Sequence, residues 1–89
     1  MNAVDTLRAA ACALSHRPDL AHAPALAGLL YNRADDMERN ITLWQSAGQD
    51  VPALVDKHYG MYLVVAAAVL VDPHNSAELP APSPKQTKP

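Results

Sequence analysis

Phenylalanine is absent from this 89-residue chain, and cysteine occurs only once, at Cys12. A single cysteine excludes a disulfide framework within the chain, and with no recognisable signal sequence it predicts a reducing, cytoplasmic setting. The three glycines stand apart from one another, so no glycine-rich loop is present that would cradle a phosphate. The sequence therefore carries neither a disulfide scaffold nor a common nucleotide-binding motif.

Basic side chains are scarce in the part of the chain that we expect to fold. Residues 1–72 carry five Lys and Arg against eight Asp and Glu, and the whole chain has a net charge of −2. Proteins that bind DNA or RNA usually present a basic surface, because contacts with phosphates supply much of their affinity. We therefore expect no direct contact with nucleic acid.

Three segments carry the signals of helices. The segment 3–16 follows Asn2, the segment 24–47 begins with a proline, and the segment 51–72 follows Asp50. Asparagine and aspartate are favoured N-cap residues, and proline is favoured in a first helical turn. The sequence predicts an all-α fold, a small three-helix bundle built from an N-terminal helix and a helical hairpin.

The first two predicted helices each have one apolar stripe at the three- and four-residue spacing of an amphipathic helix. In the first helix the stripe residues are Val4, Leu7, Ala11 and Leu14. In the second they are Leu26, Leu30, Ala34, Met37, Ile41 and Trp44. We expect both stripes to face the core, with Trp44 packing against the start of the third helix.

The third predicted helix differs, because Met61 to Val71 is an unbroken apolar run of eleven residues. Such a run is shorter than the roughly 20 residues that span a bilayer, so we expect no membrane insertion. A helix that is apolar on every side needs cover on every side, which two partner helices cannot supply. We therefore predict that a second copy of the chain, or else another protein, completes the bundle. The residues predicted to mediate this self-association are Met61, Tyr62, Val65, Val69 and Leu70.

The composition changes after residue 72, which we take as the end of the helical domain, 1–72. The segment 73–89 holds five of the eight prolines and no aromatic residue. Such a segment has little apolar surface to bury, so we predict a disordered, proline-rich tail.

Catalytic chemistry has few candidate residues in this chain. His16 lies four residues after Cys12, close enough on a helix to reach its thiol. A nucleophile also needs an oriented base and a pocket that excludes water, and the sequence signals neither. We interpret Cys12 as a small, half-buried packing residue. We therefore expect a protein that is not an enzyme and holds no cofactor.

The acidic part of the second predicted helix is a candidate metal site. Asp35 and Glu38 share a helix face, and a hairpin would bring Glu38 level with His58. The paired Glu-x-x-His motifs of di-metal bundles are absent from the sequence, however. We interpret the acidic segment instead as a solvated face with ion pairs within the helix, such as Asp35 with Arg39, and we expect no metal.

The leading hypothesis is a non-enzymatic protein-interaction module that self-associates and acts as an adaptor or inhibitor of a larger protein. The candidate face for that partner lies on the second helix and comprises Tyr31, Asn32, Asp35, Asp36 and Arg39. The length, the alanine-rich composition and the lack of catalytic groups are compatible with an accessory protein of bacterial or phage origin.

Two alternatives stay open. The first is a small-molecule-binding dimer with a pocket beside Met61, Tyr62 and Val65, in which His58 or Tyr59 would serve as the polar group. The second is a metal-dependent enzyme built on Asp35, Glu38 and His58. No stretch of the chain carries a motif specific enough to name a family.

Overall fold

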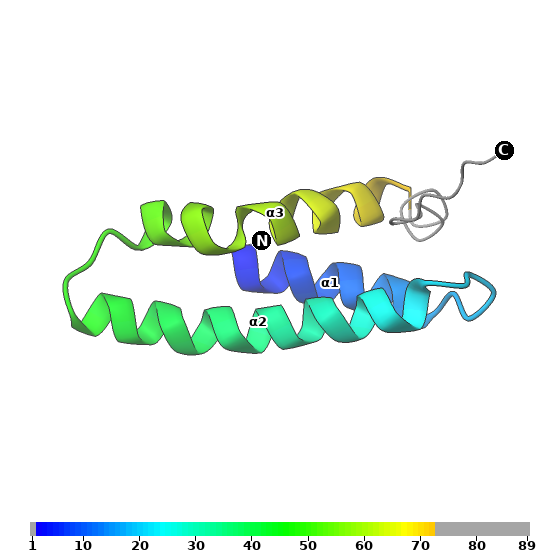
Figure 1. Cartoon of the computed structure of the whole chain (residues 1–89), viewed down its shortest axis with the longest axis horizontal. Helices are drawn as coiled ribbons and strands as arrows, with labels where there is room; N and C mark the ends of the chain where they lie inside the picture. The colour runs from blue at the N-terminus through cyan, green and yellow to red at the C-terminus, as the bar shows by residue number, and fades with distance from the viewer. Residues whose placement is uncertain (1, 73–89) are drawn as a thin grey trace, which may run out of the picture.

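The computed structural model describes residues 2–72, which form three helices, α1 (Ala3–Ser15), α2 (Ala23–Ser46) and α3 (Val51–Val71), and no strand (Figure 1). The predicted all-α, three-helix architecture is confirmed, and each helix bound lies within one residue of the predicted one. The predicted tail, 73–89, lies outside the described residues, so its disorder stays a prediction.

The helices begin and end where the local chemistry favours it. The Asn2 side chain accepts a hydrogen bond from the Asp5 amide at 2.8 Å, and Asp50 accepts one from the Ala53 amide at 3.3 Å. Each cap satisfies one of the amides that a first helical turn leaves unpaired. Gly48 adopts φ 69°, a left-handed conformation that favours glycine, and so lets the chain turn from α2 towards α3.

The core lies where the stripes of α1 and α2 meet the inner side of α3. Five large side chains are fully buried there, namely Leu7, Leu14, Leu30, Met37 and Val69. Several alanines are buried between them, Ala10, Ala11, Ala34 and Ala66 among these. No polar or charged residue is buried between residues 2 and 72. The core is therefore built mainly from aliphatic and small side chains, with Tyr59 as its one buried aromatic residue among residues 2–72.

The helix α1 is much shorter than its two neighbours, with 13 residues against 24 in α2 and 21 in α3. In Figure 1, α1 lies between α2 and α3 along only part of their length, and the turn between α2 and α3 extends beyond the start of α1. The molecule is thus a three-helix bundle at one end and a two-helix hairpin at the other.

Candidate interaction surfaces

An ionic contact joins α1 to α2. One Arg8 nitrogen, Nη2, lies 2.9 Å from Asp35 Oδ1 and 2.9 Å from Glu38 Oε1. The predicted pair of Asp35 with Arg39 within α2 is therefore wrong, because Asp35 turns towards α1 and Arg39 pairs with Asp36 at 3.4 Å. Sequence spacing indicated that an ion pair within the helix was possible, but not that α1 would bring a better placed guanidinium.

The same contact shifts two pKa values. The hydrogen bond from Arg8 lowers the pKa of the Glu38 carboxyl, and the positive charge of Arg8 adds to this effect. The hydrogen bonds to Glu38 and Asp35 in turn raise the pKa of Arg8. Both shifts stabilise the charged forms. All three side chains remain substantially exposed, so this contact orients the helices more than it stabilises them.

A polar contact of another kind joins α2 to α3. The Tyr59 hydroxyl donates a hydrogen bond to Asp36 Oδ2 at 2.5 Å and accepts one from Asn40 Nδ2 at 2.6 Å. The bond from Tyr59 lowers the pKa of Asp36. Burial is the main cause that raises the pKa of Tyr59, and its bond to Asp36 acts in the same direction. Tyr59 is only 3% exposed, so its hydroxyl is the polar end of a core residue.

Trp44 lies partly buried at the end of the α2 stripe and packs against the first half of α3, where its ring stacks on His58. The two ring centres are 5.6 Å apart with the planes inclined by 28°, and Tyr59 lies 6.4 Å away in a tilted arrangement. Two residues of the candidate metal site have other partners in the structure, because Glu38 pairs with Arg8 and His58 packs on Trp44. Over residues 2–72, no three His, Cys, Asp or Glu residues gather closely enough to hold a metal ion.

A cation–π contact also joins α2 to α3. The Arg33 guanidinium carbon lies 5.6 Å from the centre of the Tyr62 ring. The Arg33 Nε atom is buried and has no hydrogen-bond partner, so Arg33 is held here by stacking on the ring and by the attraction between its charge and Asp36. Tyr62 is thereby held towards α2 and away from the outer surface of α3.

Cys12 is exposed, so the prediction of a half-buried packing residue is wrong. His16 does come near it, with Nδ1 3.8 Å from the Cys12 sulfur. The same Nδ1 lies only 2.9 Å from the Cys12 carbonyl oxygen. A carbonyl oxygen only accepts a hydrogen bond, so this shorter contact forms in the tautomer whose Nδ1 carries the proton, and in that tautomer Nδ1 does not take the thiol proton.

The predicted partner face of α2 is divided by the structure. Tyr31, Asn32 and Arg39 are exposed, with Tyr31 exposed by 40%. Asp35 turns to α1 and Asp36 to α3, so both acidic residues take part in contacts within the chain. Tyr31 lines an open pocket of about 370 Å³, together with residues from the end of α1 and the start of α2. Tyr31, Asn32 and Arg39 are therefore the residues of this face that do not join α2 to another helix.

The predicted self-association residues are divided as well. Met61 is 75% exposed and Leu70 is 42% exposed, whereas Tyr62 and Val65 are half-buried against the core. Val69 is fully buried, so it does not contribute to the surface of a single copy.

Two strongly exposed residues of α3 were missed, Val64 at 70% and Val71 at 85% exposed. The apolar run has no polar residue to mark its outer side, so the sequence pattern alone did not indicate them. The structure places Tyr59, Tyr62, Ala66 and Val69 on the inner side at spacings of three and four, which puts Val64 and Val71 on the opposite side of the helix. We define the outer face of α3 as Lys57, Met61, Val64, Ala68 and Val71, all of which are exposed.

The complete helix α3 is longer than its eleven-residue apolar run, and this difference matters for a possible membrane contact. Its 21 residues are long and apolar enough to cross a membrane, judged by length and composition, with 22% of the most apolar stretch buried within the fold. The eleven-residue run is too short to span a bilayer, but the complete helix is not. Length therefore does not decide between a lipid surface and a protein surface as the cover for α3.

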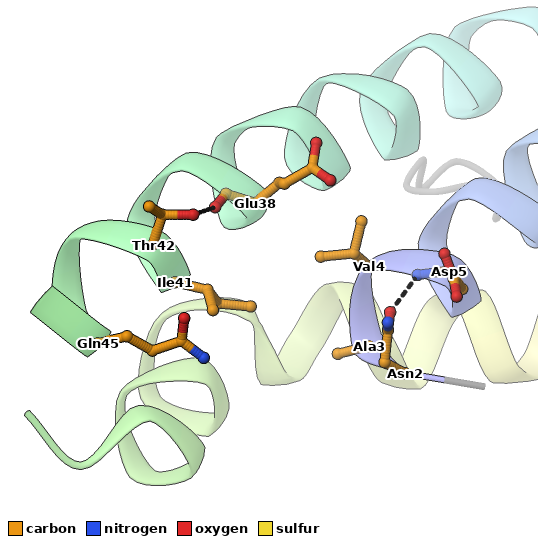
Figure 2. Close-up of a pocket in the computed structure, with 8 residues that line it drawn as sticks. All are labelled: Asn2, Ala3, Val4, Asp5, Glu38, Ile41, Thr42 and Gln45. Atoms are coloured by element: carbon orange, nitrogen blue, oxygen red, sulfur yellow. Dashed lines mark hydrogen bonds between the residues drawn. The ribbon is translucent and has the colours of Figure 1, made fainter.

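A second open pocket, of about 340 Å³, lies where α1 begins beside the last turns of α2 (Figure 2). Figure 2 shows Val4 on one side and Ile41 with Gln45 on the other. The carboxylates of Asp5 and Glu38 at its edge disfavour an anion at the α1 N-terminus. Its lining contains none of Met61, Tyr62 and Val65, so it is not the ligand pocket that the sequence suggested.

Comparisons with protein families, with curated proteins and with solved structures show no match to this chain.

Proposed function

We propose that this protein is a non-enzymatic interaction module that self-associates through α3 and presents the Tyr31 side of α2 to a larger protein, as an adaptor or inhibitor. The observation that carries the proposal is the outer face of α3. Met61, Val64 and Val71 are between 70% and 85% exposed on one helix. Scattered exposed apolar residues are ordinary on a protein surface, but a contiguous apolar strip along one helix marks an interaction site.

The polar groups of the chain support the non-enzymatic part of the proposal. The acidic residues that a metal or acid–base mechanism would use have structural partners, Glu38 with Arg8 and Asp36 with Tyr59. His58 is stacked on Trp44. Each of these side chains fixes one helix against another, which is a structural role.

The first test is sedimentation velocity of the full chain over a wide range of concentration. We expect a reversible increase in mass towards a dimer. In Met61→Asp, a charge placed in the outer face of α3 should abolish this increase, because a buried carboxylate without a partner is strongly unfavourable. The matched control is Leu43→Asp, which makes the same change at a 63% exposed apolar residue of α2. A strict monomer at every concentration would refute self-association.

The second test concerns the larger partner. Affinity capture from extracts of the native source should be made with the original chain and with Tyr31→Ala/Asn32→Ala, whose side chains are both exposed. Charge reversal at Asp35, Asp36 or Glu38 is unsuitable here, because these residues hold the helices together. We expect the double variant to lose the captured protein while its circular dichroism is unchanged. Equal capture by both would exclude the Tyr31 side as the binding surface.

A further inference from the structure

The outer face of α3 follows a regular seam. Lys57, Met61, Val64, Ala68 and Val71 are separated by four, three, four and three residues, which is the spacing of the contact positions in a coiled coil. The half-buried Leu54 extends the seam by one position towards the start of the helix. In Figure 1, α1 and α2 both lie on the same side of α3, so the seam points away from the rest of the described bundle.

We propose that α3 pairs antiparallel with α3 of a second copy of this chain, around a two-fold axis between Met61 and Val64. The inference rests on the self-association proposed above and adds its direction and register. With this axis, Met61 faces Val64 of the second copy, Lys57 faces its Ala68, and Leu54 faces its Val71. Every seam position is then matched, and the overlap covers almost the full helix.

Side-chain size supports this register. A well-packed seam sets large side chains against smaller ones, so that successive layers have similar width. The antiparallel register does so in each layer, with Leu54 and Met61 against valines and Lys57 against an alanine. A parallel pair would instead place Met61 against Met61 and Ala68 against Ala68. That arrangement alternates crowded layers with gaps.

Charge supports the antiparallel direction independently. In a parallel pair the two Lys57 side chains would face each other, which is unfavourable for like charges. In the antiparallel pair they stand eleven residues apart, or about 16 Å at a rise of 1.5 Å per residue. Each Lys57 then lies beside the last turn of the other α3. That turn has no basic residue of its own, and a helix C-terminus favours a cation.

The inner side of α3 favours a second copy over a bilayer as the cover. Tyr59 is bonded to Asp36 and Asn40, and Tyr62 stacks against Arg33, so insertion into lipid would break contacts with α2. A contact made by a single 21-residue helix on each copy is narrow, and complexes with small interfaces are typically weak or transient. We therefore expect a weak dimer, with a dissociation constant on the order of micromolar.

Cysteine cross-linking tests the direction. The exposed native thiol is first removed as Cys12→Ser, and Lys57→Cys and Ala68→Cys are then made singly in that background. A disulfide needs Cα atoms less than about 7 Å apart. In the antiparallel pair only an equimolar mixture of the two variants meets this condition, and each variant alone leaves its thiols about 16 Å apart. One variant carries an affinity tag, so that the mixed dimer is identified on a gel.

The expected result is a cross-linked dimer in the mixture and none in either variant alone. Cross-linking of each variant alone, with none between them, would show a parallel pair and overturn the inference while leaving self-association intact. If the chain forms dimers in sedimentation but neither the mixture nor a single variant cross-links, the contact lies elsewhere on the chain. That result would also overturn the antiparallel pair while leaving self-association intact. A chain that stays monomeric and co-floats with phosphatidylcholine vesicles would overturn both proposals and identify lipid as the cover of α3.

Discussion

The outward surfaces of α2 and α3 differ in what the fold does with them. On α2, Asp35 and Glu38 bind Arg8 of α1, and Asp36 binds Tyr59 of α3, so its polar groups hold the bundle together. On α3, Met61, Val64 and Val71 contribute nothing comparable to the described fold. The comparison teaches that the acidic segment, the richest polar cluster in the sequence, is mostly structural. The uncovered apolar face is where function is best sought.

The largest expected effect distinguishes the two sides of α3. Val69→Ala removes two buried methyl groups and should lower the free energy of unfolding by about 2 kcal/mol. Val64→Ala, on the exposed side, should leave it unchanged or raise it by about 0.5 kcal/mol, since alanine favours a helix more than valine does. Chemical denaturation followed by circular dichroism, at protein concentrations that keep the chain monomeric, measures both.

Equal destabilisation by the two variants would mean that Val64 is covered within a single copy. The comparison between the faces of α3, and with it the antiparallel pair, would then fail. If Val64→Ala weakens the dimer while leaving the monomer stable, Val64 acts between copies and Val69 acts within one copy.

An intermediate effect is expected at the contact between α2 and α3. Tyr59→Phe removes the hydroxyl that bonds Asp36 and Asn40, and should lower the free energy of unfolding by about 1 kcal/mol. Tyr31→Phe, at an exposed tyrosine, is the matched control and should change it by less than about 0.5 kcal/mol. Thermal and urea unfolding at pH 7 compare the two. If the two variants behave alike, Asp36 is not held by Tyr59 and is available for a partner.

The same tyrosine gives the chain an alkaline sensitivity. The pKa of Tyr59 is raised in the folded state, mainly by burial, so the folded chain keeps this proton more tightly than the unfolded chain. Its contribution to stability is complete below the ordinary tyrosine pKa of about 10 and is lost as the pH rises through the higher folded value. Unfolding measured between pH 9 and pH 11 should show this loss, and Tyr59→Phe should remove that part of it.

The smallest effect is expected from the ionic contact between α1 and α2. The pKa values of Glu38 and Asp36 are lowered in the folded state by their hydrogen bonds from Arg8 and Tyr59. Groups of this kind stabilise the fold above their ordinary pKa of about 4, and the stability is lost as the pH falls through the lower folded values. The free energy of unfolding should therefore decline between about pH 5 and pH 2.

Arg8→Met should flatten this decline, because Glu38 then returns towards its ordinary pKa. Arg17→Met is the matched control, since Arg17 pairs with Asp19 in the connection between α1 and α2 and touches neither shifted carboxylate in α2. Urea unfolding at several pH values compares the variants. An unchanged slope in Arg8→Met would mean that the contact between α1 and α2 is weaker in solution than its 2.9 Å distances indicate.

The extent of prediction from sequence can be judged from single residues. Asn2, Asp50 and Gly48 act through their own backbone or the next turn, so the bounds of the helices follow from local sequence. The stripe residues Leu7, Leu14, Leu30 and Met37 follow from the helical period and are fully buried. The partners of Asp35, Glu38 and His58 were not predictable, because each lies on another helix whose rotation and offset are set by packing.

The sequence by itself therefore determined the three helices, their bounds and the apolar stripes of α1 and α2, because these depend on propensity, capping and period. Only the tertiary structure decided which side of α3 is used within the bundle. An eleven-residue apolar run has no polar side to mark its outer surface, so the sequence pattern does not distinguish Val69 from Val64. Packing against α1 and α2 makes that distinction, burying Val69 and leaving Val64 70% exposed.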